Sequence, residues 1–249
     1  MQNFKKNKIT IITVVKNSLD KIERCIQSVI NQNYDNIEYI IIDGGSNDGT
    51  IDIIKKYSDK IDKVIIENDN GIWDAMNKGL KIAKGDIVGF LNSDDTYNQN
   101  TLKIVNNYFN NFQIDFLFGS VKKYKVMHGF SPWKIKYSFG FYTSHSVGFF
   151  INLDKHKEVG FYNSKYFSAD LDIFYKIIVK HKMKGIASKK IEIFGEFSRG
   201  GYSSKINYID HLFDLNQIRI DNGQNKFLVY ALFLIKIIKK PLKFLKSIK

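Results

Sequence analysis

The chain has 249 residues, of which 44% are hydrophobic and 25% are charged, and it contains a single cysteine. This composition excludes an intrinsically disordered chain, and one cysteine excludes an internal disulfide framework and a multi-cysteine metal site. The formal net charge of +13 is segregated, because residues 1–100 carry −2 and residues 101–249 carry +15. The basic second part indicates an anionic partner, which could be phosphate, a membrane surface or nucleic acid.

Four apolar, β-branched runs in the first hundred residues predict strands. They are Ile9–Val15, Ile37–Ile42, Val64–Ile66 and Ile87–Leu91. Helical patterns separate them, over residues 20–30, 50–57 and 72–83. Near-continuous apolar strands are typical of a sheet covered on both faces, so this order predicts an α/β fold with a doubly wound, mostly parallel sheet and helices on both faces.

The first predicted helix carries two local signals. Asp20 with Glu23 three residues later resembles a capping box at the helix start. Cys25 falls on the apolar face of the same helix, so we interpret it as a buried core thiol and not as a catalytic one. After residue 100 the pattern loosens, and we expect a helix over 101–109, a strand over Asp115–Val121 and a helix over Ser168–His181.

The C-terminal residues 225–249 predict a basic amphipathic helix. Nine apolar residues from Phe227 to Ile235 are followed by lysines at helical spacing. The apolar run is shorter than the roughly 20 residues that a membrane span needs, and a helix lying on an anionic membrane surface fits better. The alternative is a helix packed on the domain with its lysines in solvent. Because "MQNFKKNK" leads directly into a strand pattern, we expect no secretory signal and a cytoplasmic protein, peripheral on the inner face of the membrane.

Polar residues gather where the predicted strands end. These ends are Thr13 with Lys16 and Asn17, "DGGSNDGT" at 43–50, "ENDNG" at 67–71 and "NSDD" at 92–95. Ligands of open α/β sheets bind beyond the carboxyl ends of the strands. Carboxylates suit Mn²⁺ or Mg²⁺ bridged to substrate phosphates, so the ends predict a metal and phosphate site. The alternative for 43–50 is a polar turn in which Thr50 caps a helix.

Two phosphate-binding loops are excluded or disfavoured. The chain contains no GxxxxGK[ST], so it is not a P-loop protein, and "GGSNDG" lacks the GxGxxG of a dinucleotide fold.

The order and spacing of these segments resemble a known family. "ITIITVVKN", "IEYIIIDGGSNDGT" and "ENDNGIWDAMNKGLKIAKGDIVGFLNSDD" together resemble the family 2 glycosyltransferases, which have the GT-A fold. The likeness is closest to the bacterial enzymes of capsule, O-antigen or exopolysaccharide synthesis. It runs from about residue 8 to 100 and more weakly to 203. It implies a GT-A domain over 1–224, with a nucleotide-binding half at 1–100 and an acceptor half at 101–224.

The resemblance also implies roles for residues of the first half. Thr13 and Asp43 would hold the nucleotide base, and Asp94 and Asp95 would face the ribose and bind the metal. The segment that would close over the nucleotide makes candidates of Asp69, Asp74 and Asn77, for which helix capping is the alternative.

Two positions depart from the pattern of many family members. Gly44 and Asn92 each stand where those members have an aspartate. Both departures remove a carboxylate, so they bear on how tightly the metal is held and which nucleotide is read.

In the second half, transfer with inversion needs a base for the acceptor hydroxyl. Asp170 matches the family's acid at a helix start, with Ala169 in place of a glutamate, and Asp172 would point elsewhere. The alternative for Asp170 is a charge stabilised by the helix dipole. His145 in "SHSVGFF" is a candidate on the acceptor side, and Arg199 in "SRGGYSS" is a candidate for the donor phosphates. A structural histidine and a plain surface turn are the respective alternatives.

The leading hypothesis is an inverting, metal-dependent glycosyltransferase that uses a nucleotide-diphosphate sugar, with UDP preferred by family frequency, and a glycan or lipid-linked acceptor. A nucleotidyltransferase would need a basic glycine loop after the first strand, which "TVVKNSLDK" does not supply. A nucleic-acid-binding module would not require the acidic pocket, so we expect no nucleic acid partner. An inactive family member acting as a scaffold stays an alternative, because acids are missing at 44, 92 and 169.

Overall fold

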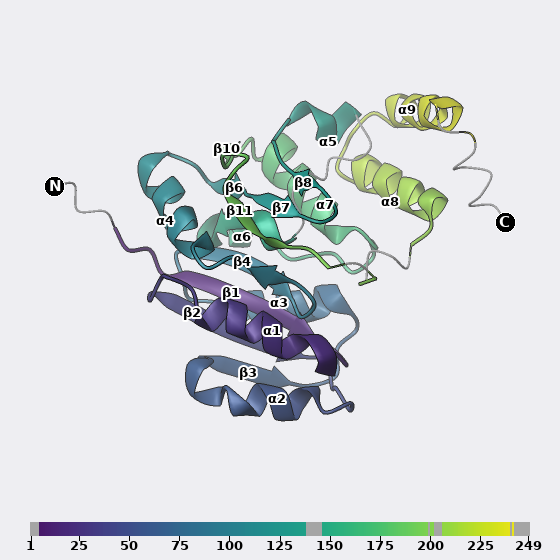
Figure 1. The fold of residues 1–249 in the computed structure, drawn as a ribbon. Coiled ribbons are helices and arrows are strands. Elements are labelled where there is room, and N and C mark those ends of the chain that lie inside the picture. Colours follow the sequence, from purple (N-terminus) through teal and green to yellow (C-terminus); the bar gives the residue numbers. More distant parts are fainter. Residues whose placement is uncertain (1–4, 138–145, 199, 202–205, 240, 242–249) are drawn as a thin grey trace. The chain divides into compact units, whose positions relative to one another are not determined.

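The computed structural model describes residues 5–137, 146–198, 200–201, 206–239 and 241 (Figure 1). The chain divides into two compact units. The first comprises residues 1–130, 143–161 and 183–198, and the second comprises 131–142, 162–182 and 199–249. The domain boundaries expected at 100 and 224 stay predictions.

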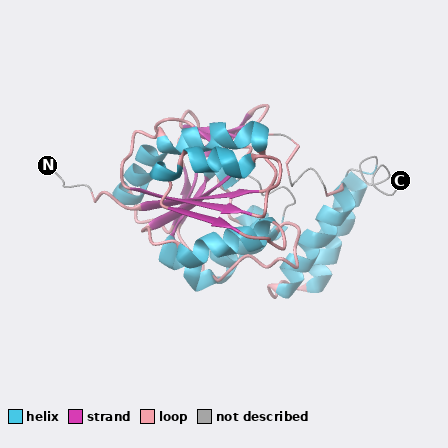
Figure 2. Ribbon diagram, turned by 90° about the horizontal axis from the view of Figure 1, so that it is seen from below, coloured by secondary structure: helices cyan, strands magenta, loops and turns pink. Residues whose placement is uncertain are grey.

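The first unit is built on a seven-stranded sheet. Its strands, in spatial order, are β10 (Gly185–Ala187), β6 (Phe116–Phe118), β9 (Phe149–Asn152), β4 (Ile87–Asn92), β1 (Ile9–Val15), β2 (Ile37–Asp43) and β3 (Lys63–Ile66). All neighbouring pairs are parallel except those of β9, which is antiparallel to β4 and β6. Helices lie on both sides of this sheet (Figure 2). The predicted mostly parallel α/β sheet is confirmed.

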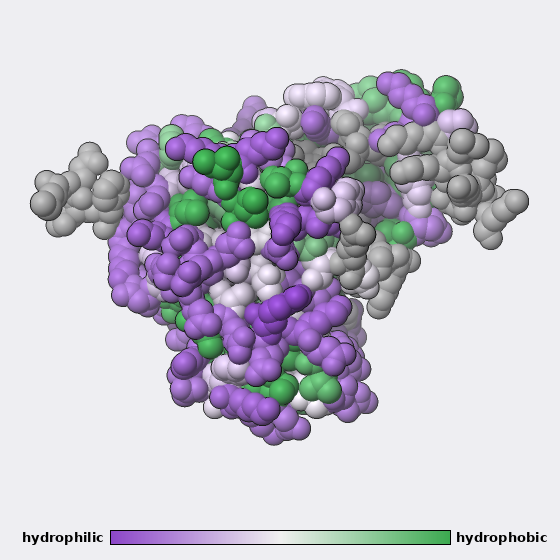
Figure 3. Space-filling view, in the orientation of Figure 1, coloured by the Kyte–Doolittle hydropathy of each residue, from purple (hydrophilic) through white to green (hydrophobic). Residues whose placement is uncertain are grey.

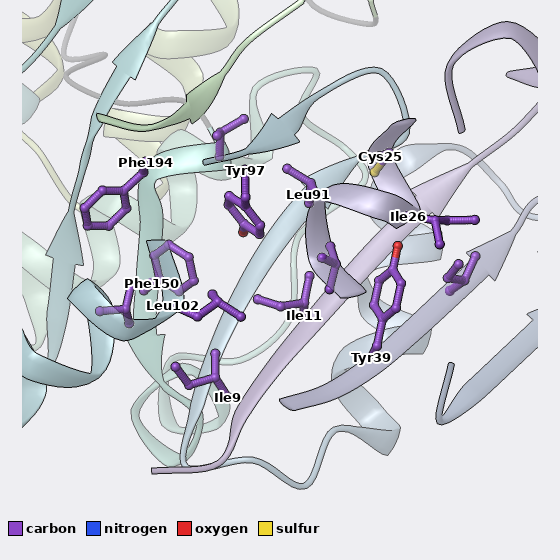
Figure 4. Packing of buried hydrophobic residues seen from close by; sticks show 14 of the residues in the cluster. Ile9, Ile11, Cys25, Ile26, Tyr39, Leu91, Tyr97, Leu102, Phe150 and Phe194 are labelled. Carbon is purple, nitrogen blue, oxygen red and sulfur yellow. The ribbon is translucent and has the colours of Figure 1, made fainter. Parts of the chain in front are cut away.

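The helices of this unit follow from the predicted apolar patterns. They are α1 (Leu19–Ile30), α2 (Thr50–Lys56), α3 (Ile72–Ile82), α4 (Thr101–Asn111) and α6 (Leu153–Val159), with short 3₁₀ turns at Ser58–Lys60 and Ser146–Gly148. On one sheet face, Ile11 and Tyr39 belong to the same buried cluster as Cys25 and Ile26 of α1 (Figure 4). Burial of such side chains contributes roughly 1.5–3 kcal/mol each. Cys25 is fully buried, as expected.

The opposite face of the sheet packs on α3 and α6. A Cβ atom at Gly79 of α3 would lie 2.5 Å from Ile12 of β1, so only glycine allows this helix to approach the strand so closely. The ring of His156 on α6 lies 6.0 Å from the ring of Phe90 on β4, measured between centroids. The second face is therefore covered as well, which explains why β1 and β4 are apolar on both sides.

The start of α1 differs from the capping-box prediction, which is wrong. The helix begins at Leu19 and no side chain of its own caps it. Instead, the carboxylate of Asp48 accepts a hydrogen bond from Leu19 N at 3.0 Å, and the Thr50 hydroxyl accepts one from Ser18 N at 2.8 Å. The loop after β2 therefore satisfies the first amides of α1, and this long-range partnership replaces the local one.

The strand predicted over Asp115–Val121 is also wrong, because it is two strands in different sheets. Residues after β6 enter β7 (Ser120–Lys122), which belongs to a four-stranded sheet with β5 (Thr96–Tyr97), β11 (Ile193–Glu196) and β8 (Val126–Met127). Gly119 separates β6 from β7, and a Cβ atom there would lie 2.1 Å from the Phe194 ring. The close approach of β11 at this glycine accompanies the change of sheet.

The second unit is helical. It contains α5 (Trp133–Tyr137), α7 (Ala169–Tyr175), which continues as a π-helical turn over Lys176–Lys180, α8 (Tyr208–Asp221) and α9 (Lys226–Lys239). The helix predicted over Ser168–His181 is confirmed within about one residue at each end. Arg219 of α8 is buried, and its Nε and Nη2 atoms donate to the carbonyl of Ile135 at 3.0 and 2.9 Å. This contact ties α8 to α5.

Candidate functional site

The strand register brings the ends of β2 and β4 to one edge of the sheet. Val14 of β1 pairs with Asn92, and Val15 pairs with Asp43 on the other side. Because neighbouring strands lie about 4.8 Å apart, Asn92 and Asp43 flank β1 at a separation of about 10 Å. The predicted residues Asp94 and Asp95 follow Asn92 directly, so the structure brings them to the same edge as Asp43.

Asp43 organises the loop after β2. Its Oδ1 atom accepts hydrogen bonds from Gly45 N at 2.9 Å and Ser46 N at 2.7 Å. The side chain is fully buried, and its Oδ2 atom has no hydrogen-bond partner among the described residues. A buried acceptor without a donor is uncommon in native proteins. Asp43 is therefore held in place by one oxygen and keeps the other for a donor.

Asp69 lies against Gly44, at the end of β2. Its Oδ1 atom accepts a hydrogen bond from Gly71 N at 3.0 Å. A Cβ atom at position 44 would lie 2.1 Å from the Oδ2 atom of Asp69. The carboxylate of Asp69 thus occupies the space that any side chain at 44 would need. Asp69, from the loop after β3, therefore places a carboxylate next to position 44, where many family members have an aspartate.

Asp95 is as buried as Asp43, with 0% of its surface exposed. Its Oδ1 atom accepts a hydrogen bond from Ser198 N at 2.8 Å, while Oδ2 has no hydrogen-bond partner within the described part of the chain. Burial raises the pKa of Asp95 well above its usual value, and the neighbouring charge of Asp94 raises it further. The bond from Ser198, the charge of Arg24 and the amide of Asn92 oppose this rise only in part.

These atoms fit a divalent cation. Asp95 Oδ2 and Asn92 Oδ1 are both buried without a partner among the residues described, and Asp94 beside them is partly exposed. A cation would supply the positive charge that the buried carboxylate lacks. No group of three or more Asp, Glu, His or Cys side chains that could hold a metal occurs in the described ranges. Phosphate oxygens and water commonly complete the coordination of Mg²⁺ in proteins.

Asn92 also affects the ionisation of Asp95. Its side-chain amide lowers the pKa of Asp95, whereas an aspartate at 92 would add a second negative charge and raise it. Its Nδ2 atom also donates to the Ser146 hydroxyl at 3.2 Å. The departure at 92 thus favours the charged form of Asp95.

Thr13 lies behind this edge, inside the layer between β1 and α1. Its side chain is fully buried, and its hydroxyl is 3.2 Å from the Tyr39 hydroxyl and 3.9 Å from the Cys25 sulfur. Its hydroxyl is therefore occupied within the protein. The base-binding role expected for Thr13 stays a prediction, and in this structure its side chain supports the edge from within.

Two further candidates lie on the first turns of α3. Asp74 Oδ2 accepts a hydrogen bond from Asn70 N at 3.1 Å and lies 3.4 Å from Lys78 Nζ. The bond from Asn70 holds the pKa of Asp74 below its usual value. Asn77 is partly exposed on the next turn. These contacts agree with the capping alternative for Asp74, and the nucleotide roles of both residues stay predictions.

Asp170 and Asp172 lie in the first turn of α7, in the second unit. Asp170 is partly exposed, and its Oδ1 atom accepts from Leu171 N at 2.9 Å. Burial first, and then the charge of Asp170, raises the pKa of Tyr162 well above its usual value. Asp172 is 1% exposed and accepts from Asn222 Nδ2 at 2.6 Å, with Lys176 Nζ at 2.7 Å. Asp172 therefore has a structural role, which leaves Asp170 as the accessible carboxylate of the two.

The candidates His145 and Arg199 lie outside the residues that the structure describes, and their roles stay predictions. Sequence reasoning missed two residues of the β4 edge. Ser198 donates from its amide to Asp95 and from its hydroxyl to the Asp94 carbonyl, and Arg24 Nη2 donates to that carbonyl at 3.4 Å. Ser198 begins the "SRGGYSS" segment, which was the available signal. Arg24 lies among other charged residues of α1, and no feature of the sequence singled it out.

Comparison with known proteins places this site in a family context. The profile of Glycosyl transferase family 2 matches residues 10–178. The enzyme named UDP-Glc:alpha-D-GlcNAc-diphosphoundecaprenol beta-1,3-glucosyltransferase WfaP, from Escherichia coli, is 42% identical over 90 residues, which are 35% of this chain and 35% of WfaP. The chain spans less than half the length of the curated relatives it matches, from 18% to 41%.

Solved structures share the fold at low sequence identity. S. aureus TarS, residues 1–349 in complex with UDP-GlcNAc, superposes with a TM-score of 0.70 at 18% identity, covering 90% of this chain and 70% of that one. The mannosyltransferase PcManGT from Pyrobaculum calidifontis, in complex with GDP-Man and Mn²⁺, gives a TM-score of 0.68 at 17% identity, with 91% and 69% covered. The expected GT-A fold is confirmed. Because the family profile spans more than half of the sequence, this chain belongs to glycosyl transferase family 2.

Proposed function

We propose that this chain transfers a sugar from a nucleotide-diphosphate sugar to a hydroxyl group of a glycan or lipid-linked acceptor, with inversion, in surface polysaccharide biosynthesis. The observation that carries the proposal is the buried, unpartnered Oδ2 atom of Asp95 beside the partly exposed Asp94, among the described residues of the β4 edge. The activity for which WfaP is named and the UDP-GlcNAc bound to TarS support a UDP-sugar donor.

In this proposal the edge of the sheet binds the nucleotide. Asp43 offers its second carboxylate oxygen to a donor group of the base, and Asp94 accepts from the ribose hydroxyls. Asp69, beside Gly44, adds a second carboxylate to the side of β1 on which Asp43 lies. These side chains set the position of the donor sugar relative to β4.

Asp94 and Asp95 would hold Mn²⁺ or Mg²⁺, with Ser198 fixing the other oxygen of Asp95. When bound, a divalent cation neutralises negative charge on the leaving nucleoside diphosphate. The Mn²⁺ in the PcManGT complex supports a cation in this fold.

Asp170 is proposed as the base. The acceptor hydroxyl attacks the anomeric carbon from the side opposite the nucleoside diphosphate, its proton passes to the Asp170 carboxylate, and the bond to the diphosphate oxygen breaks. This displacement inverts the configuration at the anomeric carbon. Asp172 could not serve, because it is buried against Lys176 and Asn222.

Helix α9 supports a membrane surface as partner. Its exposed apolar residues include Phe227 at 74%, Leu234 at 58% and Ile238 at 76%, and lysines 226, 236 and 239 lie on the same helix. Figure 3 shows hydrophobic and hydrophilic side chains over this helix. None of the described helices is both long enough and apolar enough to cross a bilayer. The proposal is therefore a protein that lies on the inner face of the cytoplasmic membrane through α9.

Hydrolysis of nucleotide-sugars in a screen of UDP-, GDP- and dTDP-sugars tests the donor. We expect a UDP-sugar to be consumed with Mn²⁺, and consumption to be lost in Asp95→Ala. Asp170→Asn should keep donor binding and lose transfer to acceptor by about a hundredfold or more. Unchanged transfer in Asp170→Asn would remove this residue as the base, and a protein that hydrolyses and binds none of these donors would refute the proposal.

Flotation with vesicles tests the membrane contact. The full chain should bind vesicles that contain anionic phosphatidylglycerol, and serine at 227, 234 and 238 together should release it. Replacing the exposed Phe112, the residue that follows α4, by serine is the matched control and should leave binding unchanged. Binding that survives the triple substitution in α9 would show that this helix is not the anchor.

A further inference from the structure

A pocket of about 600 Å³ lies within the second unit, and none of the site residues predicted from the sequence lines it. Its lining includes Asp210, Phe213, Asp214, Asn216 and Gln217 of α8 and Tyr230 of α9. The volume falls in the range of small-molecule sites, which combine apolar walls with a few convergent polar groups.

Asn216 gives this pocket an unmet hydrogen-bonding capacity. The residue is 4% exposed and lies on the buried side of α8, which also carries Leu212, Leu215 and Ile218. Neither its amide nitrogen nor its carbonyl oxygen has a hydrogen-bond partner in the described part of the chain. A carboxamide can donate two hydrogen bonds and accept two, and buried polar groups are almost always satisfied. Both atoms are also closed to solvent in this structure, so a ligand or a water in the pocket satisfies them only after the side chains around Asn216 shift slightly.

The charges around Asn216 select against anions. Asp210 and Asp214 both line the pocket, and Asp214 accepts from Phe167 N at 3.1 Å and Ser168 N at 2.7 Å. Lys165, a cation in the lining, is paired with Asp221 at 2.8 Å. A phosphate or carboxylate would meet net negative charge in this pocket, whereas hydroxyl groups can donate to these carboxylates.

Two aromatic rings supply the apolar part. Phe213 is 56% exposed and Tyr230 is 53% exposed, and both line the pocket. Flat aromatic faces bury apolar area at low conformational cost. A pyranose ring presents hydroxyl groups at its edge and C–H groups on its faces, so it matches both the polar and the aromatic parts of this lining.

We propose that this pocket binds a neutral saccharide. The hydroxyl groups contact Asn216, Gln217 and the two aspartates, directly or through a water, and a sugar face lies on Phe213 or Tyr230. The binding itself does not depend on the donor site. Its use for the acceptor glycan rests on the proposed function.

Saturation-transfer NMR of the full chain, without nucleotide or cation, tests the proposal. The probes are the methyl glycosides of glucose, galactose, mannose and N-acetylglucosamine, with methyl glucuronide as the anionic probe. We expect transfer to ring protons of at least one neutral glycoside, and less than a fifth of that signal for the glucuronide. Because donor ligands are absent, this result is independent of whether the transferase proposal holds.

Three variants locate the signal. Asn216→Leu keeps the side-chain volume and removes the unsatisfied amide, so it should fold with a Tm no lower than wild type and lose the transfer. Tyr230→Ala should reduce the transfer at least threefold. Leu228→Ala, on the same helix and outside the pocket, should leave it unchanged. The proposal is overturned if no neutral glycoside gives a signal, if Asn216→Leu keeps the signal, or if the glucuronide binds as well as the neutral sugars.

Discussion

Two buried carboxylates, one in each unit, have nearly equal exposure and opposite surroundings. Asp172 on α7 is 1% exposed and has Lys176 Nζ at 2.7 Å and Asn222 Nδ2 at 2.6 Å. Asp95 after β4 is 0% exposed and has one backbone amide, from Ser198, on one oxygen. Burial raises the pKa of Asp95 well above its usual value, while the nearest carboxylate, Asp94, adds negative charge. The first carboxylate is satisfied by the protein, and the second requires a ligand.

The largest effect on stability should come from breaking the satisfied pair. Asp172→Ala leaves Lys176 and Asn222 without their partner, and we expect the free energy of unfolding to fall by about 3–5 kcal/mol. Urea denaturation measures this change. Asp170→Ala, at the partly exposed neighbour, is the matched control and should change it by less than about 0.5 kcal/mol. Equal losses in both variants would contradict the structural role of Asp172.

A third buried titratable group, His156, extends the comparison to pH. Burial lowers its pKa from the usual 6.5 to about 4, so the unfolded chain binds its proton first as pH falls. Stability from the neutral ring is therefore complete above pH 6.5 and is lost as pH falls to about 4. The loss amounts to about 3 kcal/mol at 1.36 kcal/mol per pKa unit. His156→Gln should flatten the unfolding free energy measured between pH 7 and 4. An unchanged dependence of the unfolding free energy on pH would show that the titration of other groups determines it.

A smaller effect on stability is expected at Gly44, which lies at the carboxyl edge of the sheet beside the Asp69 carboxylate. Gly44→Ala places a Cβ atom 2.1 Å from Asp69 Oδ2 and must displace that carboxylate. Because the neighbour is the end of a side chain, stability should change by less than about 1 kcal/mol. The KM for the nucleotide-sugar should rise about tenfold, which corresponds to 1.4 kcal/mol.

A double-mutant cycle checks that Gly44 and Asp69 act together. Asp69→Ala alone should raise the KM by a similar factor, and adding Gly44→Ala to it should have little further effect, because the carboxylate is already gone. Multiplicative effects of the two changes would show that Gly44 matters for another reason, such as the shape of the loop after β2.

The elements read best from the sequence are those with local, periodic signals. Strands β1 to β4 and helices α1 to α4 begin and end within two residues of the predicted limits, because near-continuous apolar runs and helical spacing report burial directly. The acidic edge followed from the polar residues at the strand ends, and the register of Val14 with Asn92 and Val15 with Asp43 places them together.

The features that the sequence did not reveal depend on partners distant in the chain. The change of sheet at Gly119 accompanies its contact with Phe194, and the start of α1 depends on Asp48 and Thr50 of another loop. The place of Asp69 beside Gly44 and the unpartnered amide of Asn216, judged over the described residues, likewise follow from packing. No periodicity or spacing encodes these contacts.

The central claim is that the buried carboxylate of Asp95 binds a divalent cation together with a nucleoside diphosphate. Its most direct test is thermal unfolding with UDP, with and without Mn²⁺. The account predicts that UDP raises the Tm of the wild-type chain only when Mn²⁺ is present. It also predicts that Asp95→Asn abolishes this rise while unfolding, without ligands, at a temperature no lower than wild type, since the uncompensated buried charge is gone. An equal Mn²⁺-dependent rise in Asp95→Asn, or none in the wild-type chain, would contradict it.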